Sequence, residues 1–166
     1  LDPGLGTTGW GVIMADGNRL SHIANGQIKT DSKAPLSNRL LALDTALTDL
    51  FLLHRPDGAA VEEVFVNANP QSTLKLGQAR GAAICGVFPV IATVCEYAPR
   101  EVKLAIVGQG GAQKEQVQLM VMSLLKLQGE LGPDAADAIG LALCHAYSRG
   151  ARRAVDAASG LLGARP

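Results

Sequence analysis

The sequence of 166 residues has no excess of charge of either sign, no long hydrophobic run and few cysteines. Its 15 basic and 15 acidic side chains give a formal net charge of zero, which on its face argues against a protein that binds a polyanion. The hydrophobic fraction of 48% and the charged fraction of 18% exclude wholesale disorder and fibrous structure. The length is that of a single domain with a full core.

Membrane insertion and secretion are not expected. The longest stretch without charge lies between Arg80 and Glu96, and Pro89 interrupts it, so it is too short to span a bilayer. No basic segment followed by an apolar one opens the chain. Because the chain begins with Leu1 rather than methionine, we expect further residues upstream of Asp2.

The cysteines give no framework for a disulfide or a zinc site. Cys85, Cys95 and Cys144 contain no C-x-x-C pair, and their number is odd. We expect them to be buried, small hydrophobic side chains in a reducing cytosol.

The zero net charge is the sum of acidic segments and basic segments of the chain. Residues 1–66 carry five basic and eight acidic side chains, whereas residues 67–126 carry six basic and three acidic ones. Residues 127–137 carry three acidic side chains alone, and residues 138–166 carry four arginines against one aspartate. Neutrality therefore does not mean an even mixture of charges.

The pattern of apolar residues and turn residues predicts an α/β domain. Strands are expected first, followed by helices that alternate with strands, which favours a mixed sheet of about five strands with helices on both faces. We expect residues 1–150 to form this domain and residues 151–166 to form a basic, flexible tail. The predicted strands are 10–15, 19–30, 59–66 and 90–97, and the predicted helices are 36–53, 72–87, one starting at 99, 112–127 and 133–149.

Four carboxylates occupy positions where solubility does not require them. Asp2 stands just before a Pro-Gly turn, and Glu62 lies in a strand too apolar to be an edge. Asp134 and Asp137 are three residues apart at the start of the last helix, so they share one face. Unpaired charges in such places are costly, and a divalent cation that bridges them would offset the cost.

The chemistry of this set points to magnesium or manganese. Oxygen ligands without nearby histidine or cysteine suit hard cations, and two such ions can hydrolyse a phosphodiester. The same residues also have simpler interpretations: Asp134 caps a helix, Asp137 adds charge to its first turn, and Glu62 or Glu63 faces solvent. Spacing alone leaves these alternatives open.

Several motifs, in order along the chain, resemble those of the bacterial RuvC-type Holliday junction resolvases, the crossover junction endodeoxyribonucleases. The most specific is Leu-Lys-Leu-Gly-Gln-Ala-Arg-Gly at residues 74–81. The others are Asp-Pro-Gly at 2–4, Thr-Gly-Trp-Gly-Val-Ile at 8–13, Val-Glu-Glu-Val-Phe at 61–65 and Asp-Ala-Ala-Asp-Ala at 134–138. The resemblance covers the chain from residue 1 to about residue 148.

The resemblance implies a ribonuclease-H-like fold and a homodimer in the bacterial cytoplasm. It implies that the enzyme cleaves four-way DNA junctions by paired nicks in strands of like polarity, beside a branch-migration motor of the RuvA and RuvB type. Asp2, Glu62, Asp134 and Asp137 become the catalytic carboxylates that hold magnesium, two ions per site, with manganese as a substitute. Without these four, the basic side chains outnumber the remaining 11 acidic ones by four, which leaves a basic surface for DNA.

The resemblance also assigns roles to three other residues, and two more basic residues are candidates from their place on the predicted helix at 72–87. Lys103 and Lys114 match catalytic lysines that reach DNA near the active site, and Phe65 matches an aromatic that stacks on a junction base. The residue types alone favour solvated lysines and a core phenylalanine. Lys75 and Arg80 are expected either to bind the DNA backbone or to rim a dimer interface.

Other functions remain open at the level of the sequence. A ribonuclease-H-fold nuclease that acts on RNA is the main alternative, although residues 74–81 and Phe65 speak against it. A sugar-kinase or actin-like ATPase also has an Asp-x-Gly start, but it needs two such domains and 166 residues are too few. A non-catalytic module that binds junctions is disfavoured by the intact carboxylates.

Overall fold

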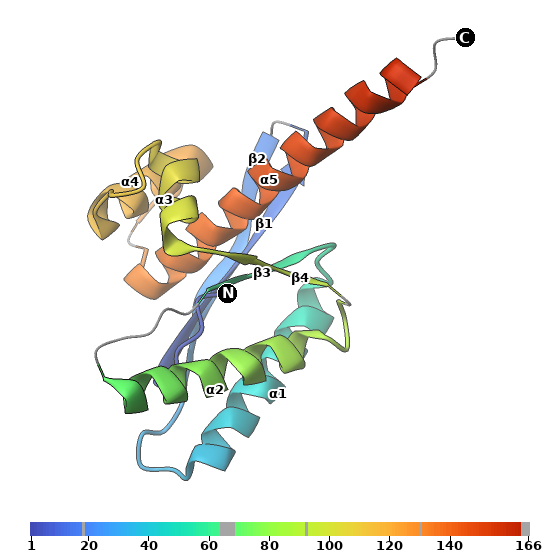
Figure 1. The fold of residues 1–166 in the computed structure, drawn as a ribbon. Coiled ribbons are helices and arrows are strands. Elements are labelled where there is room, and N and C mark those ends of the chain that lie inside the picture. Colours follow the sequence, from blue (N-terminus) through green and yellow to red (C-terminus); the bar gives the residue numbers. More distant parts are fainter. Residues whose placement is uncertain (18, 64–68, 92, 130, 164–166) are drawn as a thin grey trace.

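The computed structural model describes residues 1–17, 19–63, 69–91, 93–129 and 131–163, with residues 152–163 described by their backbone alone. Strands and helices follow one another as the sequence predicts (Figure 1). The elements are β1 (Thr7–Asp16), β2 (Arg19–Lys29), α1 (Leu36–His54), β3 (Ala59–Glu62), α2 (Pro70–Val87), β4 (Val94–Tyr97), α3 (Pro99–Val107), α4 (Lys114–Leu125) and α5 (Pro133–Gly163).

The segment Leu1–Asp2 joins two pairs of strands into a mixed sheet. β1 and β2 are antiparallel, whereas β3 and β4 are parallel. Asp2 exchanges two backbone hydrogen bonds of 3.0 Å with Gly9 of β1. On its other side, the amide of Glu62 donates to the carbonyl of Leu1 at 3.1 Å. Backbone pairing therefore runs from β2 through β1, Leu1–Asp2 and β3 to β4, which confirms the predicted mixed sheet.

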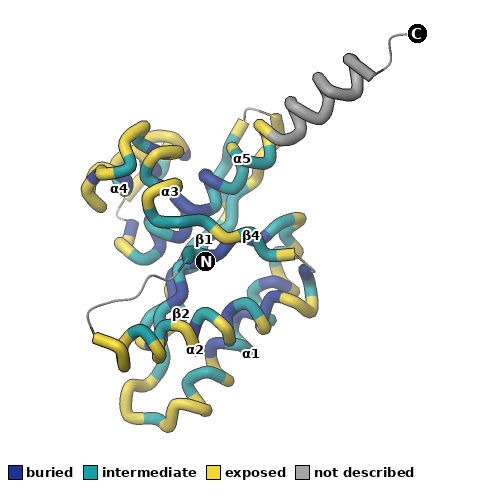
Figure 2. The backbone as a smooth tube through the Cα atoms, in the orientation of Figure 1, coloured by how far each residue is buried: buried dark blue, intermediate teal, exposed yellow. Residues whose placement is uncertain are grey.

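Helices cover both faces of this sheet, as the sequence predicts. α1 and α2 pack together on one face, and α3, α4 and α5 pack on the other (Figure 1). Each group of helices has its own hydrophobic core against the strands. Figure 2 shows the buried segments where helices and strands meet. We call the two faces the α1–α2 side and the α5 side.

The alternation of side chains along a strand places two of the four candidate carboxylates on the α5 side. Leu1 and Val61 are buried in the core of the α1–α2 side, and Ala60 is buried in the core of the α5 side. Successive side chains of an extended chain point to opposite faces. Asp2 and Glu62 therefore face the α5 side, where the last helix begins.

Several element boundaries differ from the prediction. The strand expected at 90–97 begins only at Val94, because the amides of Val90 and Ile91 bond back to the carbonyl of Val87 and extend the turn after α2. The strand expected at 59–66 is described as far as Glu62, and residues 64–68 lie outside the described part of the chain.

The last helix is longer than expected. It was predicted to end near Arg149, with a flexible tail at 151–166, but α5 continues to Gly163. Alanine has the highest helix propensity, and alanines recur between residues 151 and 158, which favours a continuing helix. Within the described ranges, none of the helices combines the length and the apolar character needed to cross a membrane.

The cysteines do not share one environment. Cys144 is buried, as predicted, and Cys95 is half-buried. Cys85 is exposed on α2, so the prediction of burial is wrong there. Its side chain lies on the face of α2 opposite to the buried Ala79 and Ala83, a difference of helical phase that composition alone does not show.

Two glycines of β1 let α5 approach the sheet closely. A Cβ atom on Gly9 would lie 2.1 Å from the backbone oxygen of Asp134, and one on Gly11 would lie 2.5 Å from Cγ1 of Ile139. Real Cβ atoms do not approach other atoms this closely, so only glycine fits at either place. The first turn of α5 is thereby held directly over the strand that pairs with Asp2.

Gly9→Ala is expected to destabilise the protein because α5 must move away from β1. Overpacking of this kind costs about 2–3 kcal/mol, equivalent to a fall in Tm of about 5–10 °C for a chain of this size. Thermal unfolding followed by circular dichroism measures it. The control is Gly6→Ala, since a Cβ atom on Gly6 meets nothing within 4 Å. Equal Tm values for the two variants would contradict the close approach.

Candidate active site

The four candidate carboxylates come from three parts of the chain. Asp2 lies on the segment that bridges β1 and β3, and Glu62 is the last residue of β3. Asp134 and Asp137 lie in the first turns of α5, which packs on β1. Asp134 was considered as an N-cap, but α5 begins at Pro133 and the amide of Ala136 already bonds to the carbonyl of Gly132 at 2.9 Å. Asp134 is therefore inside the first turn.

A buried threonine fixes the turn that follows Asp2. The hydroxyl of Thr8 donates to the carbonyl of Gly4 at 2.9 Å and accepts from the amide of Gly4 at 3.2 Å. Arg39 of α1 adds a hydrogen bond of 3.0 Å from Nη2 to the carbonyl of Leu5. Because these bonds hold the turn, the chain returns at Gly9 in register with Asp2.

Asp2 and Glu62 lie close enough for each to shift the pKa of the other. Burial raises the pKa of Asp2, and the nearby charge of Asp137 raises it further. Burial also raises the pKa of Glu62, and the charge of Asp2 and a hydrogen bond to it add to the effect, to a value of about 7. The hydrogen bond between the two carboxyl groups raises the pKa of Glu62 and opposes the rise in the pKa of Asp2. Near neutral pH, the pair carries less than its full negative charge.

Lys114 is the basic side chain that meets this cluster. Its Nζ donates to Oδ2 of Asp137 at 2.7 Å from the first residue of α4. This hydrogen bond and the charges of Asp137, Asp2 and Glu62 raise the pKa of Lys114. The structure therefore brings together Asp2, Glu62, Asp137 and Lys114, four of the residues selected from the sequence.

Asp134 is held at the side of the cluster by a strand residue. Oδ2 of Asp134 accepts a hydrogen bond of 2.9 Å from Nε2 of Gln27 on β2. In the cross-strand register, Gln27 is opposite Gly9, which is itself opposite Asp2. Among the described residues, no three acidic, histidine or cysteine side chains converge closely enough to form a ready-made cage for a metal ion.

Arg80 is occupied by contacts within the protein. Its Nη2 forms an ion pair with Oε2 of Glu96 on β4, and its Nε donates to the backbone carbonyl of Glu62 at 3.2 Å. Lys75, on the same helix, is exposed. Arg80 therefore differs from Lys75, although both were expected either to bind the DNA backbone or to rim a dimer interface.

The other predicted DNA contacts have less defined surroundings. Lys103 lies half-buried on α3 and has no hydrogen bond or ion pair with any residue that the structure describes. Phe65 falls at 64–68, outside the described residues.

Sequence reasoning missed three residues that support the site. Thr8 lies in the Thr-Gly-Trp-Gly motif, which is the signal that could have marked it, and the structure shows that it is a buried polar residue with hydrogen-bond partners. Gln27 and Glu96 gave no local signal. Each is a polar residue on a strand, and its role depends on a partner far away in the sequence.

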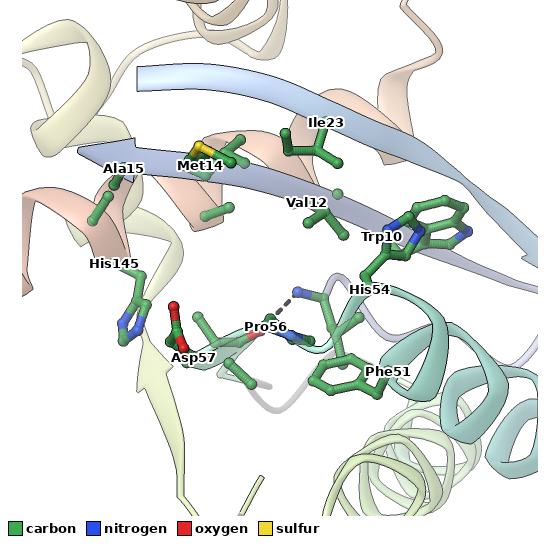
Figure 3. A pocket seen from close by; sticks show the side chains of 18 of the residues that line it. Trp10, Val12, Met14, Ala15, Ile23, Phe51, His54, Pro56, Asp57 and His145 are labelled. Carbon is green, nitrogen blue, oxygen red and sulfur yellow. Dashed lines mark hydrogen bonds between the residues drawn. The ribbon is translucent and has the colours of Figure 1, made fainter. Parts of the chain in front are cut away.

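The carboxylates lie outside the cavity formed between β1, the end of α1 and α5. This cavity of about 680 Å³ is lined by β1, the end of α1 and the middle of α5, and none of the four carboxylates lines it. Figure 3 shows Trp10, Val12 and Met14 of β1 facing His54 and Asp57, with His145 at one end. The candidate carboxylates lie instead near the end of β3 and the start of α5.

The residues present fit a divalent cation in their chemistry. Asp2, Glu62 and Asp137 offer hard oxygen ligands, and their mutual repulsion and burial raise the pKa values of Asp2 and Glu62. Lys114 supplies one positive charge to this group. A cation that draws Asp134 and Asp137 toward Asp2 and Glu62 would relieve the repulsion.

A mixed sheet with helices on both faces, and with carboxylates on its central strands beside the start of the last helix, defines the class as the ribonuclease-H-like nucleases. Comparisons with known proteins agree. A solved structure of T. thermophilus RuvC in complex with a Holliday junction substrate superposes with a TM-score of 0.83 and 33% identity, covering 89% of this chain and 92% of that one. A second structure of Thermus thermophilus RuvC gives a TM-score of 0.80 at 32% identity.

The sequence comparisons identify the family. The family model described as crossover junction endodeoxyribonuclease RuvC matches residues 1–145. The RuvC of Sphingopyxis alaskensis is 60% identical over 149 residues, which cover 90% of this chain and 96% of that protein. The RuvC of Herminiimonas arsenicoxydans is 57% identical over 148 residues, covering 89% and 82%. The chain belongs to the RuvC family of crossover junction endodeoxyribonucleases.

The raised pKa of Glu62 predicts a stability that depends on pH in metal-free protein. Its pKa is about 7 in the folded state against the ordinary 4.5, so the folded state retains a proton that the unfolded chain has lost. The free energy of unfolding should therefore fall as pH rises from 4.5 to 7 and then level off. Glu62→Gln removes this pH-dependent fall in the free energy of unfolding. At pH 8 the variant should therefore be more stable than the wild type by about 1–2 kcal/mol, after allowance for solvent screening.

Urea unfolding in the presence of a chelator, at pH 4 and pH 8, measures this difference. At pH 4 the variant should show no such gain, because Glu62 is protonated in both states. Parallel pH profiles for the two proteins would show that Glu62 titrates normally.

Proposed function

We propose that the protein is a structure-selective endonuclease that resolves four-way DNA junctions by paired, symmetric nicks in strands of like polarity, in DNA recombination and repair. The observation that carries the proposal is the group of Asp2, Glu62 and Asp137 beside Lys114 on the fold of this family. The match to a RuvC structure that contains a Holliday junction substrate supports the choice of DNA junctions over RNA.

We propose that Asp2, Glu62, Asp134 and Asp137 hold two magnesium ions, with manganese as a substitute. When bound, the ions would lower the pKa of an attacking water and neutralise charge on the leaving oxygen of the phosphodiester. The reaction adds water across the P–O3′ bond and leaves a 5′-phosphate and a 3′-hydroxyl.

The side chains of the chain itself bind and orient the DNA in this proposal. Lys114 is released from Asp137 and turns its ammonium group toward the scissile phosphate, whose charge grows in the transition state. Lys103 on α3 adds a second cation, and Lys75 binds the backbone farther out on α2. Phe65 stacks on a junction base at the end of the β3 segment.

Asp2→Asn is expected to abolish nicking and to preserve binding to the junction. The substitution removes a metal-ligating carboxylate, so single-turnover nicking should fall by more than about 100-fold, while the DNA-binding surface is unchanged. The assay uses a synthetic four-way junction with magnesium, and binding is measured by fluorescence anisotropy. A plain duplex and an RNA–DNA hybrid serve as control substrates.

Two results would reject the proposal. Nicking of the duplex or the hybrid at the rate of the junction would remove the selectivity for four-way DNA. Loss of junction binding in Asp2→Asn would remove the catalytic assignment of this residue.

We further propose that the protein acts as a homodimer, because two symmetric cuts suit two-fold symmetry. One face of α2 is exposed and shaped for a second helix. Leu74 and Phe88 stand at its two ends with exposed fractions of 68% and 51%. Between them lie Gly77 and Gly81, where an added Cβ atom would meet nothing within 4 Å, and the exposed Cys85. Small residues between large apolar ones allow two helices to pack closely.

Gly81→Arg should convert the dimer into a monomer, because a bulky charge then stands in the middle of this α2 face. The fold should be preserved, since the position is open. Light scattering after size-exclusion chromatography reports the mass. Gly150→Arg is the matched control, since Gly150 is another exposed helical glycine with nothing within 4 Å of its Cβ position. A Gly81→Arg protein that remains dimeric would place the interface elsewhere.

The family resemblance also supports a partner and a location. We propose that the dimer acts in the bacterial cytoplasm on junctions that a branch-migration motor of the RuvA and RuvB type holds open.

A further inference from the structure

Arg80 connects α2 to the ends of both parallel strands. Its Nε donates to the backbone carbonyl of Glu62, the last residue of β3, at 3.2 Å. Its Nη2 forms an ion pair with Glu96 of β4. The guanidinium is mostly shielded, with an exposed side-chain fraction of 21%, whereas Glu96 is exposed to 50%. One planar group thus bonds two strands at the edge where the carboxylates gather.

These contacts complete a set of restraints on the backbone at Glu62. The amide of Glu62 donates to the carbonyl of Leu1, on the segment that carries Asp2, at 3.1 Å. The amide of Glu63 donates to the carbonyl of Tyr97 on β4 at 2.9 Å. The carbonyl of Glu62 is the remaining polar group of this peptide unit, and Arg80 is its partner. The direction of the Glu62 side chain depends on this backbone being fixed.

The charge of Arg80 is balanced away from the candidate metal ligands. Its ion-pair partner is Glu96, and it reaches Glu62 through the backbone rather than through the carboxyl group. An arginine paired with the Glu62 carboxylate would compete with a cation for it. Arg80 instead restrains the residue and leaves the carboxyl group available to a metal.

We propose that Arg80 is a positioning residue for Glu62. It holds the ends of β3 and β4 together and thereby orients the Glu62 carboxyl group toward the metal site. Arg80 does not bind DNA in this proposal. The inference rests on the proposed function of the carboxylate cluster. It separates Arg80 from Lys75, which is exposed on the same helix and free to meet a phosphate.

The test compares Arg80→Gln and Arg80→Lys with Lys75→Gln, Glu62→Gln and the wild type. A misplaced ligand should lower the single-turnover nicking rate of Arg80→Gln by about 10- to 100-fold and raise the magnesium concentration for half-maximal nicking by a similar factor. The magnesium-induced rise in Tm, measured without DNA, should shrink in the same variant. Junction affinity and its salt dependence should stay within about 2-fold of the wild type, whereas Lys75→Gln should weaken binding and reduce the salt slope by about one.

Arg80→Lys keeps the charge but not the two-pronged geometry. It should therefore retain junction affinity and still require more magnesium than the wild type for half-maximal nicking. If Arg80→Gln does not fold, Arg80→Lys is used in its place. Weaker junction binding with an unchanged magnesium requirement, in either variant, would overturn the inference and make Arg80 a DNA contact. Failure of the wild type to nick, or normal nicking by Glu62→Gln, would instead refute the proposed function of the site.

Discussion

The structure depends on the pairing of Leu1–Asp2 with a strand on either side. Hydrogen bonds to Gly9 of β1 and to Glu62 of β3 make this short segment the centre of the sheet. Alternation then points Asp2 and Glu62 to the same face, and the glycines of β1 admit the start of α5 on that face. Four residues from distant parts of the sequence meet because one segment is held in register.

Electrostatic repulsion makes this cluster a candidate for binding a cation. Burial and like charge raise the pKa values of Asp2 and Glu62, and Lys114 is the cation that meets them. A site arranged in this way stores unfavourable charge that a divalent ion relieves. The same reasoning explains the zero net charge of the chain: acidic side chains gathered at one site offset a basic excess elsewhere, so neutrality does not exclude a DNA substrate.

The sequence predicted the element order because it follows from local patterns, whereas the choice of the four carboxylates depended on the family motifs as well as on spacing. Glu62 in an apolar strand and the pair Asp134 and Asp137 at a helix start were visible from spacing and the family motifs. The bonds from Gln27 to Asp134 and from Arg80 to Glu62 and Glu96 were not predicted, because such pairs are set by strand register and helix packing. The end of α5 was placed near Arg149 because the residues beyond it lack the apolar periodicity of a packed helix, yet the helix continues to Gly163.

We propose that these carboxylates form one metal site. A crystal structure with Mn²⁺, recorded at a wavelength where manganese scatters anomalously, would show whether they do. Anomalous peaks are expected between Asp2, Glu62 and the first turns of α5, with Lys114 detached from Asp137. The absence of any peak there, with the Lys114–Asp137 ion pair still intact at saturating Mn²⁺, would contradict the proposal.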